Sequence, residues 1–225
     1  MTTCKMISAF GFAIVFLLLA FPSTLSAQNA PVPSKDEGWK QLFDGKTLVN
    51  WQPTSFGGEG QVHVEDGQII LDMGGDLTGI NWSGGPLPKM DYEISLEAMK
   101  LDGNDFFCGL TFPAGDSYCS FIVGGWAGVV VGLSSIDGRD ASENETTRLM
   151  KFLKNRWYRI RVKVTQAKIE TWIDQEKMVD VVTTGRRISV RGEVEPSKPL
   201  GIASWRTKAA LRDIKMRKLQ AEKVK

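Results

Sequence analysis

Two stretches of the chain alternate strictly between apolar and polar residues: DYEISLEA at residues 91–98 and YRIRVKV at residues 158–164. A period of two is typical of a β-strand with one face in a core and the other in water. Residues 169, 171 and 173 continue the alternation after a turn at 165–168. We therefore expect these segments to form antiparallel strands of a sheet with one solvated face.

Shorter strand-like runs occur along the rest of the chain, at residues 61–65, 68–72, 106–112, 118–123, 129–133, 178–182, 200–205 and 209–216. Turn pairs such as Asp66-Gly67, Asp102-Gly103 and Asp137-Gly138 separate the runs. No segment has the period of a helix longer than two turns. The sequence predicts an all-β fold, a two-sheet antiparallel β-sandwich or jelly roll.

The N-terminus has the order of a secretory signal peptide. Lys5 precedes an apolar run at residues 7–21, and small residues follow at 23–27. The apolar run is short for a membrane span. We expect cleavage after Ala27 and a secreted or periplasmic protein, which contacts a membrane only if the signal stays as an uncleaved anchor. The predicted organisation is a signal peptide (1–27), a linker (28–37), a jelly-roll domain (38–219) and a frayed C-terminal tail (220–225).

The charge balance and the histidine content exclude several classes of protein. Lys and Arg number 28 and Asp and Glu number 26, so the formal net charge is +2. A near-neutral chain excludes a nucleic-acid binder that relies on bulk charge. With one histidine, His63, a zinc site built on several histidines is excluded too. We interpret His63 as a partly exposed strand residue; the alternative is a lone catalytic base.

Two cysteines, Cys108 and Cys119, flank the turn-like residues 113–116 and survive signal cleavage. If these runs form a hairpin, the two thiols can face each other on adjacent strands. An oxidising compartment would then favour a disulfide between Cys108 and Cys119. Two buried free thiols are the alternative.

The motif GWKQLFDGKTL at residues 38–48, closed by Trp51, resembles the opening of the 3-keto-disaccharide hydrolase domain family. Further stretches that resemble the family follow in its order: HVEDGQI at 63–69, DYEISLE at 91–97, RWYRI at 156–160 and LRDIKMRKL at 211–219. The resemblance implies a concanavalin A-like jelly roll. It also implies an exported carbohydrate-active domain that cleaves 3-keto-glycosides.

The chemistry that the resemblance implies begins with a ketone at C3 of a sugar. The ketone acidifies the hydrogen on C2, because the carbanion is delocalised as an enolate. A general base removes that proton, the group on C1 leaves by elimination, and water then adds back. Such a site needs a carboxylate, a donor or a divalent cation at the enolate oxygen, and aromatic faces for the sugar.

The chain departs from the family where typical members carry polar residues. Those members have an Asn-Ser-Gly-Ile stretch ending in arginine, then Tyr-Glu and a glutamine on the next strand. Here the stretch is FCGL at residues 107–110, and Pro113, Cys119 and Phe121 stand where arginine, glutamate and glutamine are expected. This loss favours a non-catalytic carbohydrate-binding module as the first alternative. A structural or protein-interaction sandwich is the second.

The most polar loop, residues 134–148, follows a glycine-rich run at 124–132. Its acids can supply the general base or coordinate a divalent cation. The alternative is a solvated loop whose acids pair with Arg139 and Arg148. The candidate catalytic residues are Asp137, Asp140, Glu143 and Glu145.

Three tryptophans adjoin glycines or a polar turn, where an indole ring can be exposed for stacking on a sugar: Trp82, Trp126 and Trp205. Arg206 can bond a hydroxyl or an enolate oxygen. A core position for each ring, and a sheet-edge charge for the arginine, are the alternatives. The remaining tryptophans are expected in the core: Trp39, Trp51, Trp157 and Trp172. We predict that Trp126, Trp205, Arg206 and at least one of the four acids border one cleft.

Overall fold

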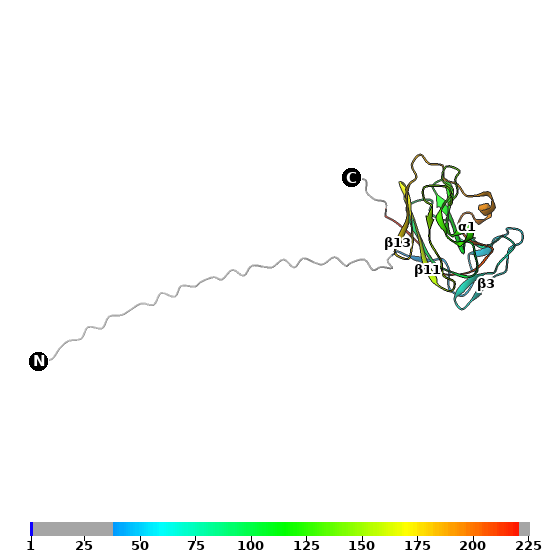
Figure 1. Cartoon of the computed structure of the whole chain (residues 1–225). Coiled ribbons are helices and arrows are strands. Elements are labelled where there is room, and N and C mark those ends of the chain that lie inside the picture. Colours follow the sequence, from blue (N-terminus) through cyan, green and yellow to red (C-terminus); the bar gives the residue numbers. More distant parts are fainter. Residues whose placement is uncertain (2–37, 221–225) are drawn as a thin grey trace. The chain divides into compact units, whose positions relative to one another are not determined.

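The structure, a computed structural model, describes Met1 and residues 38–220 (Figure 1). The predicted cleavage site at Ala27 and the linker at 28–37 lie outside the described residues. Within the described part of the chain, no helix combines the length and hydrophobicity that a bilayer crossing requires.

The first of two sheets, sheet A, is entirely antiparallel. Its strands are, in spatial order, β13 (Glu176–Val182), β12 (Lys168–Ile173), β11 (Trp157–Val164), β6 (Tyr92–Gly103), β15 (Thr207–Lys218), β4 (Gln68–Leu71) and β3 (Val62–Glu65), with β1 (Lys40–Gln41) paired to β15.

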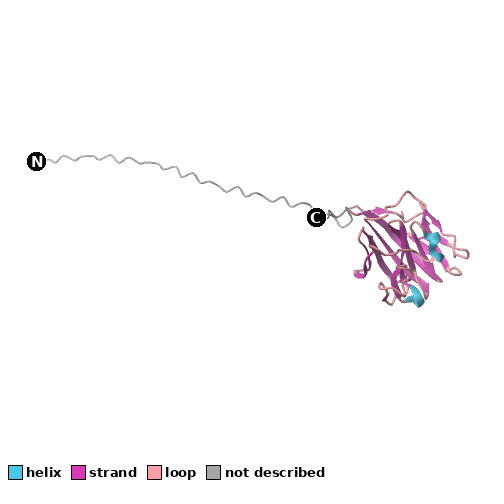
Figure 2. Cartoon of the chain, turned by 90° about the horizontal axis from the view of Figure 1, so that it is seen from above, coloured by secondary structure: helices cyan, strands magenta, loops and turns pink. Residues whose placement is uncertain are grey.

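Sheet B is also antiparallel and contains the remaining strands. In spatial order they are β10 (Arg148–Leu149), β9 (Val130–Ser134), β8 (Ser117–Gly124), β7 (Cys108–Ala114), β14 (Gly201–Trp205), β5 (Leu77–Trp82) and β2 (Trp51–Pro53). The helical segments of the described chain are short: the turn α1 (Gly125–Gly128) and the 3₁₀-helix η1 (Gly192–Ser197). Strands make up most of the regular structure (Figure 2), so the predicted antiparallel β-sandwich is confirmed.

The two alternating stretches form neighbouring strands, β6 and β11. Their register pairs Tyr92 with Val164 and Leu96 with Ile160. These apolar side chains are fully buried or nearly so, while the residues between them lie on the other face of sheet A. The alternation therefore places one face of each strand in the core, as the sequence predicts.

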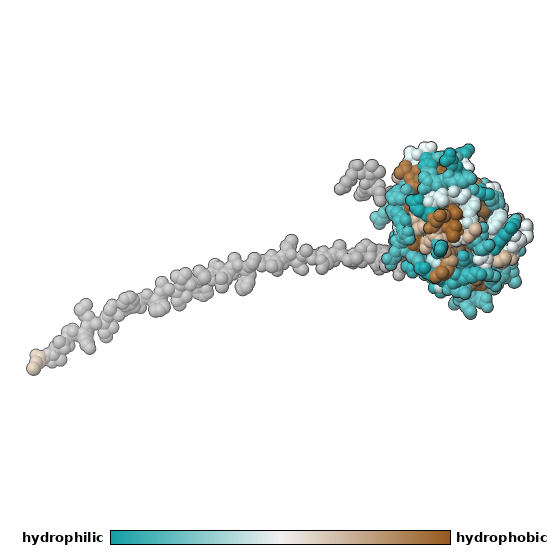
Figure 3. All heavy atoms as spheres, in the orientation of Figure 1, coloured by the Kyte–Doolittle hydropathy of each residue, from teal (hydrophilic) through white to brown (hydrophobic). Residues whose placement is uncertain are grey.

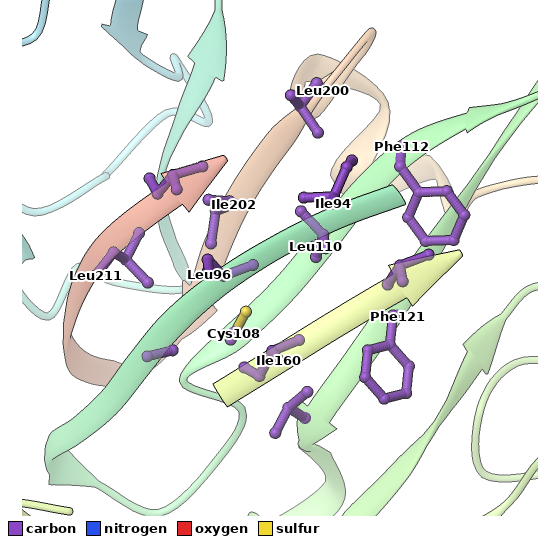
Figure 4. Packing of buried hydrophobic residues seen from close by; sticks show 14 of the residues in the cluster. Ile94, Leu96, Cys108, Leu110, Phe112, Phe121, Ile160, Leu200, Ile202 and Leu211 are labelled. Carbon is purple, nitrogen blue, oxygen red and sulfur yellow. The ribbon is translucent and has the colours of Figure 1, made fainter. Parts of the chain in front are cut away.

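The main core fills the space between the two sheets. Figure 4 shows Ile94 and Leu96 of β6 and Ile160 of β11 close to side chains of sheet B such as Leu110 and Phe121. Burial of this apolar area is the main favourable contribution to folding. The surface seen in Figure 3 is mostly hydrophilic, with a small hydrophobic area near the centre of the domain.

Strand β5 has no counterpart among the predicted strands. Its sequence, LTGINW, contains Gly79, and glycine weakens a strand signal. In the structure, a side chain at Gly79 would meet the carbonyl oxygen of Ile202 at 2.6 Å and the Cβ of Ala203 at 2.9 Å. The glycine is needed because β14 approaches so closely.

The predicted disulfide between Cys108 and Cys119 is wrong. Residues 108–124 do form a hairpin, but Cys108 pairs with Val123 and Cys119 pairs with Phe112. The two cysteines are thus four positions out of register, roughly 13 Å along a strand, and a disulfide needs Cα atoms within about 7 Å. Both are free and buried. Burial raises the pKa of the Cys119 thiol to about 12, so it is inert as a nucleophile.

Candidate functional site

The outer face of sheet B, the face turned away from the main core, is lined by unusually small side chains. Because strands alternate, Leu110, Phe121 and Ile202 point into the core and their neighbours point outward. The outward set includes Gly79, Gly109, Ser120, Gly132, Ser134, Gly201 and Ala203. Small residues leave room above the sheet for other groups.

A cavity of about 250 Å³ occupies this room. Its wall combines aromatic, charged and hydroxyl side chains from separate parts of the chain: Asp105, Phe106, Ser120, Ile122, Trp126, Ser134, Arg191, Glu193, Val194 and Trp205. We call it the sheet B pocket. The structure thus brings together two of the tryptophans proposed for stacking, Trp126 and Trp205.

Two residues at the floor of the sheet B pocket, Ser120 and Ser134, belong to a row of hydroxyl groups that crosses three strands. Thr111 pairs with Ser120, and Ser120 pairs with Ser134. The hydroxyls of Thr111 and Ser120 are 2.8 Å apart, and those of Ser134 and Ser135 are 3.4 Å apart. A hydroxyl can both donate and accept, so this floor offers hydrogen bonds to a polar ligand.

Trp126 is held at the pocket by an unusual turn. Trp126 and Ala127 have φ of 46° and 63°, in the left-handed region that non-glycine residues rarely adopt. The Asp105 carboxylate supports this turn, because it accepts hydrogen bonds from the backbone N–H of Ala127 at 3.3 Å and of Phe106 at 2.7 Å. As a result the Trp126 residue remains 37% exposed, which makes its ring available for stacking.

Trp205 is tied to the same short segment. Its backbone N–H donates to the carbonyl oxygen of Phe106 at 2.9 Å, and the two rings lie 6.4 Å apart. Residues 105 and 106 therefore connect both tryptophans. They also place the Asp105 carboxylate in the wall beside them.

Arg191 and Glu193 form the charged part of the wall. Arg191 is bonded through Nε to Glu193 and through Nη1 to Asp140, both at 2.5 Å. Its guanidinium lies 6.0 Å from the centre of the Trp126 ring. Burial lowers the pKa of Arg191, but the carboxylates of Glu193 and Asp140 more than offset this, and the pKa is raised. The arginine is charged at every relevant pH.

The four predicted catalytic acids do not converge on this pocket. Asp140 lies behind Arg191 and outside the lining, with Oδ1 also bound to Ser142. Asp137 and Glu145 both pair with Arg186, each at 2.6 Å. Arg186 borders a different cavity.

Hydrogen bonds from the Arg187 backbone and the Arg186 side chain lower the pKa of Asp137. Glu143 is exposed. The other three acids, Asp137, Asp140 and Glu145, pair with arginines outside the loop, rather than with Arg139 and Arg148 as the solvated-loop alternative has it.

Two proposed sugar contacts also lie elsewhere. Trp82 is only 7% exposed and packs edge-on against Trp51 at 5.3 Å, so the prediction of a stacking platform there is wrong. Its Nε1 donates to the carbonyl oxygen of Gly85. Arg206 is exposed and bonded to Asp76 through Nε and Nη2. Arg206 contacts Trp205 at 5.7 Å but does not line the sheet B pocket.

The structure shows where the positions of the missing family residues lie. Cys119 and Phe121 are fully buried and point into the core, where unpaired polar groups would be costly. The outward positions of β8 are Ser120 and Ile122. The polar groups of the sheet B pocket come instead from residues that sequence reasoning did not select: Asp105, Ser120, Ser134, Arg191 and Glu193.

No group of three or more potential ligands in the described part of the chain is arranged to hold a metal ion. His63 lies on β3 in sheet A and is therefore not part of the sheet B pocket. Its Nε2 is 3.7 Å from Glu65 and its Nδ1 is 3.8 Å from Asp72, both long for a hydrogen bond.

Comparison with models of protein families identifies a matching domain family. A model of the 3-keto-alpha-glucoside-1,2-lyase-like domain matches residues 38–217. Comparison with curated protein sequences gave no significant match.

Several solved structures have a similar fold. A candidate glycosyl hydrolase from Parabacteroides distasonis has a TM-score of 0.52 and 14% identity, with 83% of this chain and 96% of that chain covered. Crh5 transglycosylase in complex with NAG has a TM-score of 0.53 and 9% identity, with 81% and 84% covered. The exoplasmic/lumenal domain of VIP36, in its Ca²⁺/Man3GlcNAc-bound form, has a TM-score of 0.52 and 11% identity, with 84% and 91% covered. At such identities the likeness concerns the jelly-roll fold.

Proposed function

The chain belongs to the 3-keto-alpha-glucoside-1,2-lyase-like domain family, and from this premise we propose that the sheet B pocket binds a 3-keto-glycoside and cleaves it by elimination followed by hydration. The domain itself is a carbohydrate-related jelly roll. One observation carries the proposal: Trp126 and Trp205 border the same cavity as a carboxylate, Asp105, and an arginine, Arg191.

Sugar binding follows from the two indole rings and the hydroxyl floor. The C–H faces of a pyranose pack on an aromatic ring, while its hydroxyls need donors and acceptors. Trp126 offers an exposed ring, and Ser120 and Ser134 offer hydroxyls at the floor. A pocket with apolar walls and a few polar groups is the usual form of a small-molecule site.

Asp105 is the proposed general base. Among the residues that the structure describes it forms no ion pair, unlike Glu193, and its two backbone hydrogen bonds leave lone pairs free on the carboxylate. Asp105 would take the proton from C2 of the sugar. The electron pair would delocalise onto the C3 ketone as an enolate. Its return would form the C1–C2 double bond and break the C1–O bond, and the aglycone would leave as an alcohol after taking up the proton that Asp105 removed.

Arg191 is placed to stabilise the enolate. A guanidinium has five N–H donors, and the pairs with Asp140 and Glu193 occupy only part of them. A donor at the developing oxygen charge lowers the barrier most when it is fixed in advance. Water then adds to C1 and a proton returns to C2, which completes a net hydrolysis.

The test is turnover of methyl 3-keto-α-glucoside and of 3-keto-trehalose by the purified chain from residue 28, followed by NMR with and without divalent cations. Formation of 3-keto-glucose supports the proposal. Binding of these compounds without any product would contradict a catalytic role.

A non-catalytic carbohydrate-binding module is the second candidate. The observation that favours it is the core position of Cys119 and Phe121, where typical family members carry polar residues. A module would bind sugars through the same tryptophans and show no turnover. Absence of any sugar binding would instead leave a structural or protein-interaction sandwich.

Export is part of the proposal. The sequence favours cleavage after Ala27 and a secreted or periplasmic protein. N-terminal sequencing of the protein recovered outside the cytoplasm tests this, with residue 28 as the expected first residue. A protein that stays in the cytoplasm with Met1 intact would refute it.

A further inference from the structure

The outer face of sheet B is not a groove that is open along its length. On one side, the loop of residues 141–146 packs down on β9, and a side chain at Gly132 would meet the Ala141 carbonyl oxygen and the Thr146 hydroxyl at 3.1 Å. On the other side, Val194 of η1 joins an apolar cluster with Leu77 and Ala203. Both flanks of the face are therefore filled by the chain itself.

The third boundary of the sheet B pocket depends on Arg191. This residue spans three segments: it binds Asp140 of the long polar loop, Glu193 of η1, and faces the Trp126 ring of α1. The cavity left inside, about 250 Å³, lies below the roughly 300–1,000 Å³ of pockets that take drug-sized ligands. It is sized for one sugar ring rather than several.

Resting on the proposed function, we propose that Arg191 is a specificity-determining residue that restricts the sheet B pocket to the terminal unit of an α-glucoside. A chain that continued in both directions from the bound ring would have to pass through the guanidinium or through the filled flanks. Exclusion of a competitor by an obstructing charged group is a recognised way to build specificity. Without the guanidinium, the exposed side of Trp126 would be open to a further ring.

The experiment compares a linear and a cyclic ligand with the same number of glucose units. Maltohexaose has chain ends, and α-cyclodextrin is its cyclic counterpart without ends. Binding of each to the chain from residue 28 is measured by saturation-transfer NMR and titration. The wild type should bind maltohexaose at least about tenfold more tightly than α-cyclodextrin. Arg191→Ala should bring the two affinities together.

The matched control is Arg148→Ala, which removes an exposed arginine on the β10 edge of the same sheet. It should keep the preference of the wild type. Asp140→Ala is the second variant, because it frees Arg191 from the loop without removing it; the preference should fall to an intermediate value. A thermal melt checks that each variant is folded.

The other outcomes are distinct. If the wild type binds both ligands equally, Arg191 does not restrict the site, and the proposed function stands. If Arg191→Ala, still folded, loses both ligands, Arg191 contributes to sugar binding but does not exclude a continuing chain, and the inference fails. If the wild type binds no linear α-glucoside at all, including methyl α-glucoside, the inference fails, whereas the proposed function is decided by binding and turnover of the 3-keto compounds.

Discussion

The outer faces of the two sheets use the same residue types in opposite ways. On sheet A, outward carboxylates are enclosed by cations: Glu93 is 1% exposed and pairs with Arg161 at 2.7 Å and with Arg217 at 2.6 Å. Glu170 contacts three ammonium groups, those of Lys163, Lys168 and Lys177. Burial raises the pKa of Glu170, and hydrogen bonds from Lys177 and Lys168 more than reverse this, so the pKa is lowered.

Tryptophans follow the same division. Trp39, Trp157 and Trp172 are only partly buried on the outer side of sheet A, so the expectation that they lie in the core is wrong, whereas Trp51 is in the core. The three rings are covered by guanidinium groups at short distance: Trp172 by Arg161 at 3.8 Å, Trp157 by Arg212 at 4.0 Å and Trp39 by Arg217 at 4.7 Å. On sheet B, Arg191 stands 6.0 Å from Trp126 and leaves the ring partly open.

The difference shows what a binding face requires. On sheet A the charges and rings already satisfy one another, and little bonding capacity is left for a ligand. On sheet B, small residues leave space for a ligand. The hydroxyl groups and Asp105 can still form hydrogen bonds, and the Trp126 ring can still stack. Aromatic and charged residues therefore indicate a site only where their own chain leaves them partly unsatisfied.

The largest expected effect is on turnover. Asp105→Asn should lower turnover of a 3-keto-glucoside by about 10²–10⁴-fold, the usual contribution of a general base, while binding is spared. Asn keeps an acceptor for the Phe106 N–H. Asp102→Asn, which alters a carboxylate paired with Lys154, is the control and should retain activity. Unchanged turnover in Asp105→Asn would exclude it as the base.

The second-largest expected effect is a loss of stability when a carboxylate on the outer face of sheet A is removed. Glu170→Gln should reduce the free energy of unfolding by roughly 1–3 kcal/mol, as expected for lost charge-assisted hydrogen bonds. Because the folded pKa of Glu170 is lowered, its contribution is present at neutral pH and is lost as the pH falls below about 4. Urea unfolding at several pH values checks this. A difference from wild type that grows on acidification would contradict it.

The third effect separates the two faces directly. Trp126→Ala should weaken sugar binding by about 1–3 kcal/mol, if sugar stacking resembles base stacking on aromatic rings. Trp172→Ala on sheet A should leave the affinity unchanged, because its ring is already covered by Arg161. Calorimetric titration of both variants gives the comparison. An equal loss of affinity in both variants would show that the two faces do not differ in sugar binding.

The smallest effect concerns the acidic loop. Asp137→Asn should leave turnover within about twofold of wild type, as for most surface substitutions, since Asp137 pairs with Arg186 away from the sheet B pocket. Steady-state kinetics of the variant are sufficient. A loss of turnover comparable to that of Asp105→Asn would indicate that the general base is in the polar loop instead.

The alternating strands could be predicted from the sequence because each residue's face follows from its neighbours. The prediction that Trp126 and Trp205 share a cleft could be made from the glycines around Trp126 and the polar turn beside Trp205. Residues such as Asp105 and Arg191 carry no local signal, since they meet only when α1 and η1 fold over sheet B. The density of acids at residues 134–148 misled for the same reason: their partners, Arg186 and Arg191, lie far along the chain.

The central claim, that the sheet B pocket is the carbohydrate site, is tested most directly by ¹⁹F NMR of protein labelled with 5-fluorotryptophan. Single Trp→Phe variants assign the resonances, and methyl α-glucoside or its 3-keto form is titrated in. The account predicts shifts at Trp126 and Trp205, with Trp39, Trp157 and Trp172 unmoved. Shifts confined to the sheet A tryptophans would contradict it.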